Sequence, residues 1–162
     1  MQVRKVMSRD VLVTSPDDTI EKAATLMGKV NCGALPVSEN DRLVGMVTDR
    51  DITLRAVAKG NPPDHCTVRE VMSPDIKYVF EDEATEAAAE SMSKLQVRRL
   101  PVLNRQKRLV GIVSLGDLAF KQKEPAANAL QGISKPNGTT LNWRRRSRVP
   151  TARPSAQPSV AW

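Results

Sequence analysis

The chain has 162 residues and is 40% hydrophobic but only 3% aromatic, so its core must consist mainly of aliphatic side chains. Two cysteines are too few for a disulfide framework, and a single histidine argues against a histidine metal site or a catalytic triad. No apolar run is long enough to span a bilayer and no signal peptide is evident, so we expect a cytoplasmic protein without a membrane role. The net charge of +7 arises after residue 120, where eight basic side chains accompany one acidic side chain.

The most informative feature is an internal repeat. Residues 3–53 align with residues 68–119 at an offset of 65, which becomes 66 after a one-residue gap, and 21 positions are identical. The period is too long for a solenoid unit, and two copies are too few for an array. We therefore predict two similar subdomains packed about a pseudo-two-fold axis. Such packing leaves two equivalent clefts at the seam, where ligands commonly bind.

The first repeat occupies residues 1–60. Its expected elements, in chain order, are a leader (3–7), a strand-like stretch (11–14), a helix, two strands (34–37 and 43–48) and a second helix (49–58). Ile20, Ala23, Ala24 and Met27 share one face of the first helix, and the acidic residues before it favour a helix start.

The second repeat occupies residues 61–123 and has the same order of expected elements. Its elements are a leader (68–72), a strand-like stretch (76–80), a helix with Ala84, Ala88, Ala89 and Met92 on one face, two strands (99–103 and 109–114) and a helix (115–121). The first of the two successive strands in each repeat contains Leu-Pro-Val. Because proline cannot donate to a ladder, we expect Pro36 and Pro101 to confine these strands to an edge or a strand start.

Residues 124–162 change in character. Proline, serine and arginine are frequent and no apolar period persists, so we expect a disordered basic tail. Within it, Trp143 stands beside the cluster Arg144-Arg145-Arg146-Ser147-Arg148. Such a cluster attracts nucleic-acid phosphates without sequence preference, and a tryptophan can stack on a base, but many basic tails are inert.

A short motif recurs where the last strand of each repeat meets its second helix. It is Gly45-Met46-Val47-Thr48-Asp49-Arg50-Asp51 in one copy and Gly111-Ile112-Val113-Ser114-Leu115-Gly116-Asp117 in the other. Its hydroxyl and aspartate fit a helix capping box, a purely structural role. The same groups fit a nucleotide, because free helix amides and a hydroxyl suit phosphate and a carboxylate accepts hydrogen bonds from ribose hydroxyls.

The doubled leader, the twin Leu-Pro-Val strands and the twin G-x-x-[ST]-x-x-D motifs resemble a tandem pair of CBS domains, or Bateman module, of the small stand-alone bacterial type. The resemblance covers residues 3–121. It implies an α+β (α/β-like) fold of two β-α-β-β-α repeats packed as a pseudo-two-fold pair, followed by the tail. It also implies a homodimer that binds AMP, ADP or ATP, or S-adenosylmethionine, and that uses no catalytic cofactor.

The resemblance assigns two candidate sites. In the first, Ser114 and Asp117 contact the ribose, Arg98 and Arg99 the phosphate, and Val13, Thr14, Cys32 and Ala34 the adenine. In the second, Thr48 and Asp51 contact the ribose, Arg50 the phosphate, and Val79, Phe80 and Val97 the adenine. Uncharged Gly33-Ala34 stands where the second repeat has its two arginines, so we expect the Asp117 site to bind phosphate better.

Two functions are compatible with these features. The first is an energy-sensing regulatory module that binds an adenine nucleotide and signals its state to an unidentified partner protein. The alternative is a ligand-free structural or adaptor module whose basic tail contacts a protein or nucleic acid. Catalysis is not expected, because the sequence has neither a glycine-rich phosphate loop of the G-x-x-x-x-G-K-[ST] type nor a plausible nucleophile–base pair.

Overall fold

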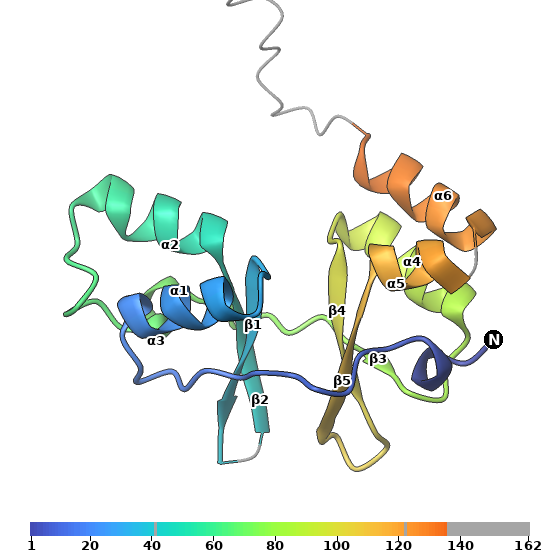
Figure 1. The fold of residues 1–162 in the computed structure, drawn as a ribbon, viewed down its shortest axis with the longest axis horizontal. Coiled ribbons are helices and arrows are strands. Elements are labelled where there is room, and N and C mark those ends of the chain that lie inside the picture. The colour runs from blue at the N-terminus through green and yellow to red at the C-terminus, as the bar shows by residue number, and fades with distance from the viewer. Residues whose placement is uncertain (41, 122, 136–162) are drawn as a thin grey trace, which may run out of the picture.

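A computed structural model describes residues 1–40, 42–121 and 123–135. Two small sheets stand next to each other, with most helices gathered beyond one end and the hairpin turns at the other (Figure 1). β1 and β2 form an antiparallel pair, and β3, β4 and β5 form a three-stranded sheet in that order. The predicted α+β pair of repeats is confirmed.

The elements follow the repeat. The first half contains α1 (Ile20–Lys29), β1 (Ala34–Glu39), β2 (Arg42–Thr48), α2 (Asp49–Arg55) and the 3-10 turn η2 (Val57–Lys59). The second half contains β3 (Val79–Phe80), α4 (Thr85–Leu95), β4 (Arg99–Leu103), β5 (Leu109–Ser114), α5 (Leu115–Lys121) and α6 (Lys123–Ile133). The leaders form η1 (Val3–Lys5) and α3 (Val68–Val71).

α1 illustrates how the sequence determines an element. The hydroxyl of Thr19 accepts a hydrogen bond from the amide of Lys22 at 3.3 Å, which caps the first turn. Ile20, Ala23 and Met27 recur at helical spacing and are buried. They pack with Leu35, Val37 and Val47 in the core of the first half.

The predicted strand-like stretches are shorter than expected. Over residues 11–14 only Thr14 pairs, in a single bridge to Val37, and over residues 76–80 only Val79–Phe80 forms a strand. The proline explains the difference: Pro36 accepts from the amide of Thr14 but has no N–H to continue the ladder. We expected both Leu-Pro-Val strands to lie at an edge or to begin at the proline. This was wrong for β4, which is the central strand and has Pro101 at its middle. The proline is tolerated because β3 begins to pair only at Val102.

Each leader crosses to the other half of the molecule. Ser8 exchanges two hydrogen bonds with Ile112 in β5, both 2.9 Å long, and Ser73 exchanges two with Met46 in β2, 3.0 and 2.8 Å long. In Figure 1 the N-terminal segment accordingly lies against the second sheet before the chain reaches α1. Val3 and Val6 are buried in the core of the second half, and Val68 and Val71 in that of the first. The two halves are thus held together by exchanged segments.

The beginning of the predicted disordered tail is helical. α6 starts at Lys123 and packs across α4 and α5, burying Ala126 and Ala129 in the core of the second half. A Cβ at Gly132 would collide with Ser93, so the two helices approach closely there. The expectation of disorder was therefore wrong for residues 124–133, because small residues on one helix face allow close packing. The rest of the predicted tail, from residue 136, lies outside the described residues, and so does the arginine cluster.

Candidate functional site

Both copies of the recurring motif form a reciprocal capping box. Ser114 Oγ donates to Asp117 Oδ2 at 2.6 Å and accepts from the amide of Asp117 at 3.1 Å, while the amide of Ser114 donates to the same carboxylate oxygen at 2.8 Å. Thr48 and Asp51 make the same three contacts, at 2.6 to 3.0 Å. Both copies of the motif therefore form the helix capping box that the sequence predicted. Within the described residues, Asp117 Oδ1 has no partner and can accept further hydrogen bonds.

A cavity of about 230 Å³ lies in the cleft beside Asp117. Cys32 and Ala34 line it from the first repeat, and Arg99, Ser114 and Asp117 line it from the second. The segment that follows the first leader adds Ser8, Asp10, Val11 and Leu12 to the lining. We name this space the Asp117 cleft. Its lining combines apolar side chains with a carboxylate and a guanidinium, which is typical of a small-molecule site.

A second hollow adjoins the Asp117 cleft and shares Arg99 and Ser114 with it. Its volume is about 610 Å³, and Arg98 and Lys123 add positive charge to its lining. None of these three cations has a side-chain hydrogen bond or ion pair within the described residues. The predicted phosphate residues Arg98 and Arg99 therefore stand together, next to the cleft that holds Asp117.

Two residues expected at the adenine position of this site lie elsewhere. Thr14 is only 1% exposed, and its hydroxyl donates to Asp18 at 2.9 Å. Val13 is 42% exposed but does not line the cleft, where its neighbours Val11 and Leu12 lie instead. Cys32 keeps the predicted position, with its thiol 3.2 Å from the carbonyl oxygen of Ala34.

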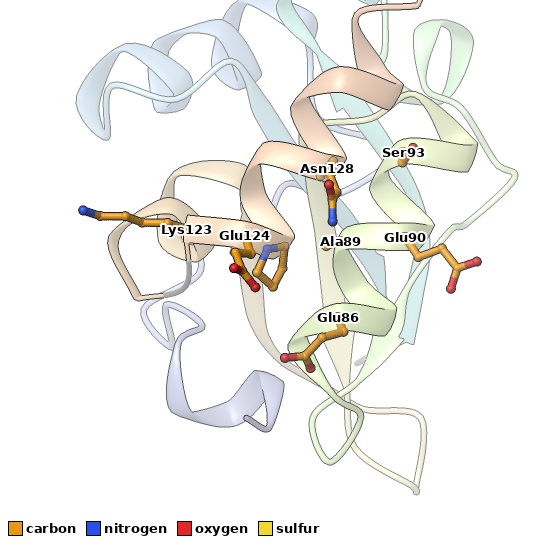
Figure 2. A pocket seen from close by; sticks show the side chains of 9 residues that line it. Glu86, Ala89, Glu90, Ser93, Lys123, Glu124 and Asn128 are labelled. Carbon is orange, nitrogen blue, oxygen red and sulfur yellow. The ribbon is translucent and has the colours of Figure 1, made fainter.

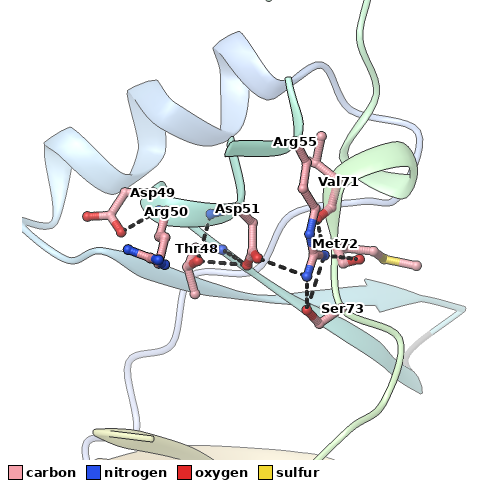
Figure 3. Close-up of polar contacts among 8 residues, drawn as sticks. All are labelled: Thr48, Asp49, Arg50, Asp51, Arg55, Val71, Met72 and Ser73. Carbon is pink, nitrogen blue, oxygen red and sulfur yellow. Dashed lines mark hydrogen bonds and ion pairs between the residues drawn. The ribbon is translucent and has the colours of Figure 1, made fainter. Parts of the chain in front are cut away.

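The second candidate site differs because Asp51 is engaged on both carboxylate oxygens. Its Oδ2 belongs to the capping box, and its Oδ1 lies 3.3 Å from the guanidinium of Arg55. Arg55 also donates to the carbonyls of Val71 and Met72 at 2.7 and 2.9 Å, so it joins α2 to the end of the second leader (Figure 3). Thr48 and Asp51 face a cation of the protein itself at the position where a ligand was predicted.

The predicted adenine residues of this second site are occupied in packing. Val79 is 2% exposed within the core of the second half. The ring of Phe80 stacks edge-on against Tyr78 and lies 4.3 Å below the guanidinium of Arg105. Val97 packs against the same core, and Arg50 is exposed. The structure thus gathers the predicted residues well at the Asp117 site and poorly at the Asp51 site.

A cavity of about 600 Å³ between α4 and α6 has the opposite charge (Figure 2). Glu86, Glu90 and Glu124 line it with Lys123 as the only cation of its lining. Carboxylates repel phosphate, so this space is unsuited to a nucleotide. Its size alone does not make it the functional site.

Sequence reasoning missed three contributors. Arg55 was overlooked although its i,i+4 spacing from Asp51 was a readable signal; its other partners, the carbonyls of Val71 and Met72, leave no mark in the sequence. Lys123 was placed at the end of the second repeat without a role in the site, and only the docking of α6 brings it beside Arg98. Asp10 lies in the crossing segment, and its place at the Asp117 cleft follows from the exchange of leaders.

No group of three or more histidine, cysteine, aspartate or glutamate side chains is placed to hold a metal ion in the described part of the chain. Among the same residues, none of the helices has the length and apolar character needed to cross a membrane.

Comparison with known proteins agrees with the fold and the repeat. The family model described as CBS domain matches residues 3–57 and again residues 68–124. The CBS domain-containing protein YhcV of Bacillus subtilis is 44% identical over 137 residues, which cover 83% of this chain and 96% of YhcV. Hypoxic response protein 1 of Mycobacterium tuberculosis is 38% identical over 124 residues, 76% of this chain and 86% of that protein.

Solved structures show the same architecture. The crystal structure of hypoxic response protein I with two coordinated zinc ions superposes with a TM-score of 0.69 at 36% identity, covering 74% of this chain and 98% of that one. The CBS domain pair of protein MJ0100, in complex with 5-methylthioadenosine and S-adenosyl-L-methionine, superposes with a TM-score of 0.68 at 29% identity, covering 76% of this chain and 98% of that one.

Proposed function

The chain belongs to the CBS domain family as a tandem pair, and from this premise we propose that it is a regulatory module that binds an adenosine-containing ligand in the Asp117 cleft. AMP, ADP and ATP are the ligands proposed first, and S-adenosylmethionine is a further candidate. The complex of the MJ0100 pair with two adenosine derivatives supports this ligand class.

One observation carries the proposal: residues from both repeats converge on one cleft next to an unpartnered carboxylate oxygen. Adenine fits the apolar side formed by Cys32 and Ala34, where the carboxylate of Asp10 can accept from an exocyclic amino group. Asp117 Oδ1 accepts from ribose hydroxyls, and Ser114 holds Asp117 in place. Phosphates then extend toward Arg98, Arg99 and Lys123 in the adjoining hollow.

The cation pattern favours one ligand per chain. In the hollow that adjoins the Asp117 cleft, Arg98, Arg99 and Lys123 have no partner among the described residues, and their charge is available to phosphate. At the Asp51 position Arg55 already neutralises the aspartate, and a ribose would have to displace it. We therefore propose the Asp117 cleft as the ligand site and the Arg55 position as a structural counterpart.

We propose that the ligand-bound state of the module is signalled to another protein. A ligand in the Asp117 cleft touches the segment that follows the first leader and both repeats, so its binding favours one arrangement of these parts over another. We further propose a homodimer, a cytoplasmic location and no catalytic activity of its own. Hexameric CBS-CP12 protein, a structural neighbour at 30% identity with a TM-score of 0.66, is a precedent for oligomers in this fold.

Calorimetric titration of the full chain with AMP, ADP, ATP and S-adenosylmethionine tests the ligand class. Ala34→Leu fills the adenine side of the cleft, whereas Ala24→Leu adds the same volume on the exposed side of α1. We expect Ala34→Leu to weaken binding by about ten-fold or more, equivalent to about 1.4 kcal/mol, and Ala24→Leu to leave it unchanged. Absence of binding by all four ligands would contradict the proposal.

The alternative is an adaptor module whose clefts stay empty. The Asp51 position favours it, because the predicted ribose carboxylate of that copy is already paired with Arg55. An adaptor would bind none of the four ligands and would retain its partner whether or not they are present. The same titration therefore separates the two functions.

A further inference from the structure

We propose that a cavity between the two hairpin turns binds a small polyanion, with an oligophosphate group as the chemical class. This hairpin cavity has a volume of about 430 Å³ and is lined from the ends of the β1–β2 and β4–β5 hairpins, which lie at the same end of the molecule (Figure 1). Its cations are Arg42 from one hairpin and Lys107 and Arg108 from the other, and its neutral polar groups are Asn40, Gln106 and Tyr78. It shares no lining residue with the Asp117 cleft.

The charge of the hairpin cavity is unbalanced. No carboxylate belongs to its described lining, and the side chains of Arg42, Lys107 and Arg108 make no hydrogen bond or ion pair with any described residue. Asp41, the sequence neighbour of Arg42, lies outside the described residues. Three like charges around one space repel one another, and a bound anion relieves that repulsion.

Not every basic side chain of the β4–β5 hairpin is left without a partner. Arg105 is paired with Asp82 at 2.9 Å and lies over the ring of Phe80. Its charge is therefore satisfied by the protein. Lys107 and Arg108, two and three residues further on, line the cavity instead.

The turn that presents these cations is firmly held. Lys107 has a φ of 58°, a left-handed conformation that a lysine rarely adopts. The side chain of Asn104 fixes the turn by accepting from the amides of Gln106 and Arg108 at 3.0 and 2.9 Å. A strained conformation held by its surroundings is often found at functional positions. Here it places two cations side by side at the cavity.

An oligophosphate fits this lining better than a single anion does. Guanidinium groups bind phosphate oxygens with two parallel hydrogen bonds, while the lysine supplies a point charge and the amides supply neutral donors. Several negative charges are needed to match three cations. Because the lining comes from both repeats, the bound anion would join them at the end opposite to most helices.

The test uses the full chain and inorganic tripolyphosphate. Tyr78 lines the cavity and is the only tyrosine of the sequence, so the NMR signals of its ring report on this space alone. The variant Arg42→Ala/Arg108→Ala removes two lining cations, and the control Lys29→Ala/Lys59→Ala removes two exposed cations elsewhere. The basic tail is the same in all of these proteins, so its own attraction for phosphate cancels in the comparison.

We expect tripolyphosphate to shift the Tyr78 signals of the natural protein and of the control, with an affinity that falls as salt is added. The affinity of the cavity variant should be lower by about ten-fold. Asp117→Ala should bind tripolyphosphate normally, so a failed nucleotide site does not affect this result. Unshifted Tyr78 signals, or equal losses in the cavity variant and its control, would overturn the proposal.

Discussion

Arg55 lies 3.3 Å from Asp51 and also donates to the carbonyls of Val71 and Met72, so a single side chain pairs with the predicted ribose carboxylate and anchors the end of the second leader. The equivalent position in the second repeat is Lys121, whose side chain makes no such contact within the described residues. Although the two repeats share 21 identical positions, their equivalent aspartates therefore differ in their partners. Arg55 makes part of this difference, and Arg98 and Arg99, which stand where the first repeat has Gly33 and Ala34, add to it.

Arg55→Ala should destabilise the fold. It removes hydrogen bonds from a charged donor to two backbone carbonyls and leaves Asp51 without its counter-ion, which we expect to lower the free energy of unfolding by about 1–2 kcal/mol. Lys121→Ala, the matched change in the second repeat, should cost less than about 0.5 kcal/mol. Urea unfolding measures both, and equal losses would show that the Arg55 contacts do not matter.

The exchange of leaders predicts a large effect at Gly111. A Cβ there would lie 2.9 Å from the carbonyl oxygen of Ser8 and 2.6 Å from the sulfur of Met7, so Gly111→Ala must push the first leader away. We expect a loss of about 1–3 kcal/mol. Gly28→Ala in α1 meets nothing within 4 Å and should stabilise by about 0.5–1 kcal/mol. Thermal unfolding that moved in the same direction for both variants would contradict the exchanged packing.

The packing of α6 can be tested by truncation and by substitution. A chain that ends at residue 121 loses the helix and uncovers the face of α4 that carries Ala89 and Ser93, whereas a chain that ends at residue 135 keeps it. We expect the shorter chain to be less stable by about 1–3 kcal/mol, and Gly132→Ala to act in the same direction, because its Cβ would collide with Ser93. Equal unfolding midpoints of the two truncated chains would show that α6 does not pack on α4.

Asp18 gives the stability a pH dependence. Burial raises the pKa of its carboxyl, but the hydrogen bond from Lys22 and those from Ser15 and Thr14 lower it by more, so the pKa of Asp18 lies below its ordinary value. A depressed carboxyl pKa stabilises the fold at neutral pH, and this stabilisation is lost as the pH falls below about 4 through the folded-state pKa. Asp18→Asn should therefore be less stable than the natural protein at pH 7 by about 1 kcal/mol. This difference in the free energy of unfolding should be smaller at pH 3. A difference of the same size at both pH values would argue against the carboxylate contacts.

The sequence predicted the regular elements well where a local rule applied. The bounds of β4 and β5 agree with the predicted strands, and the Thr48–Asp51 capping box follows directly from residue types at the right spacing. The sequence could not predict contacts that depend on distant backbone. Pro36 ends a ladder that residue pattern alone extends to Val11, and Arg55 finds carbonyls 16 and 17 residues away.

The candidate site was predictable only in part for the same reason. Cys32, Ala34, Arg99, Ser114 and Asp117 meet in one cleft as predicted, because the repeat fixes how strands and helix starts face each other. Lys123 and Asp10 join the site only through the docking of α6 and the crossing of the first leader. Both depend on tertiary packing between segments that are far apart in the sequence.

The central claim is that Asp117, and not Asp51, holds the ligand. The most direct measurement is the affinity of the full chain for AMP after Asp117→Ala and after Asp51→Ala, since each variant loses one equivalent capping box. We expect Asp117→Ala to weaken binding by about 10- to 100-fold, the loss of one or two hydrogen bonds to a charged acceptor, and Asp51→Ala to bind AMP as the natural protein does. Equal losses in both variants, or a loss confined to Asp51→Ala, would contradict the assignment.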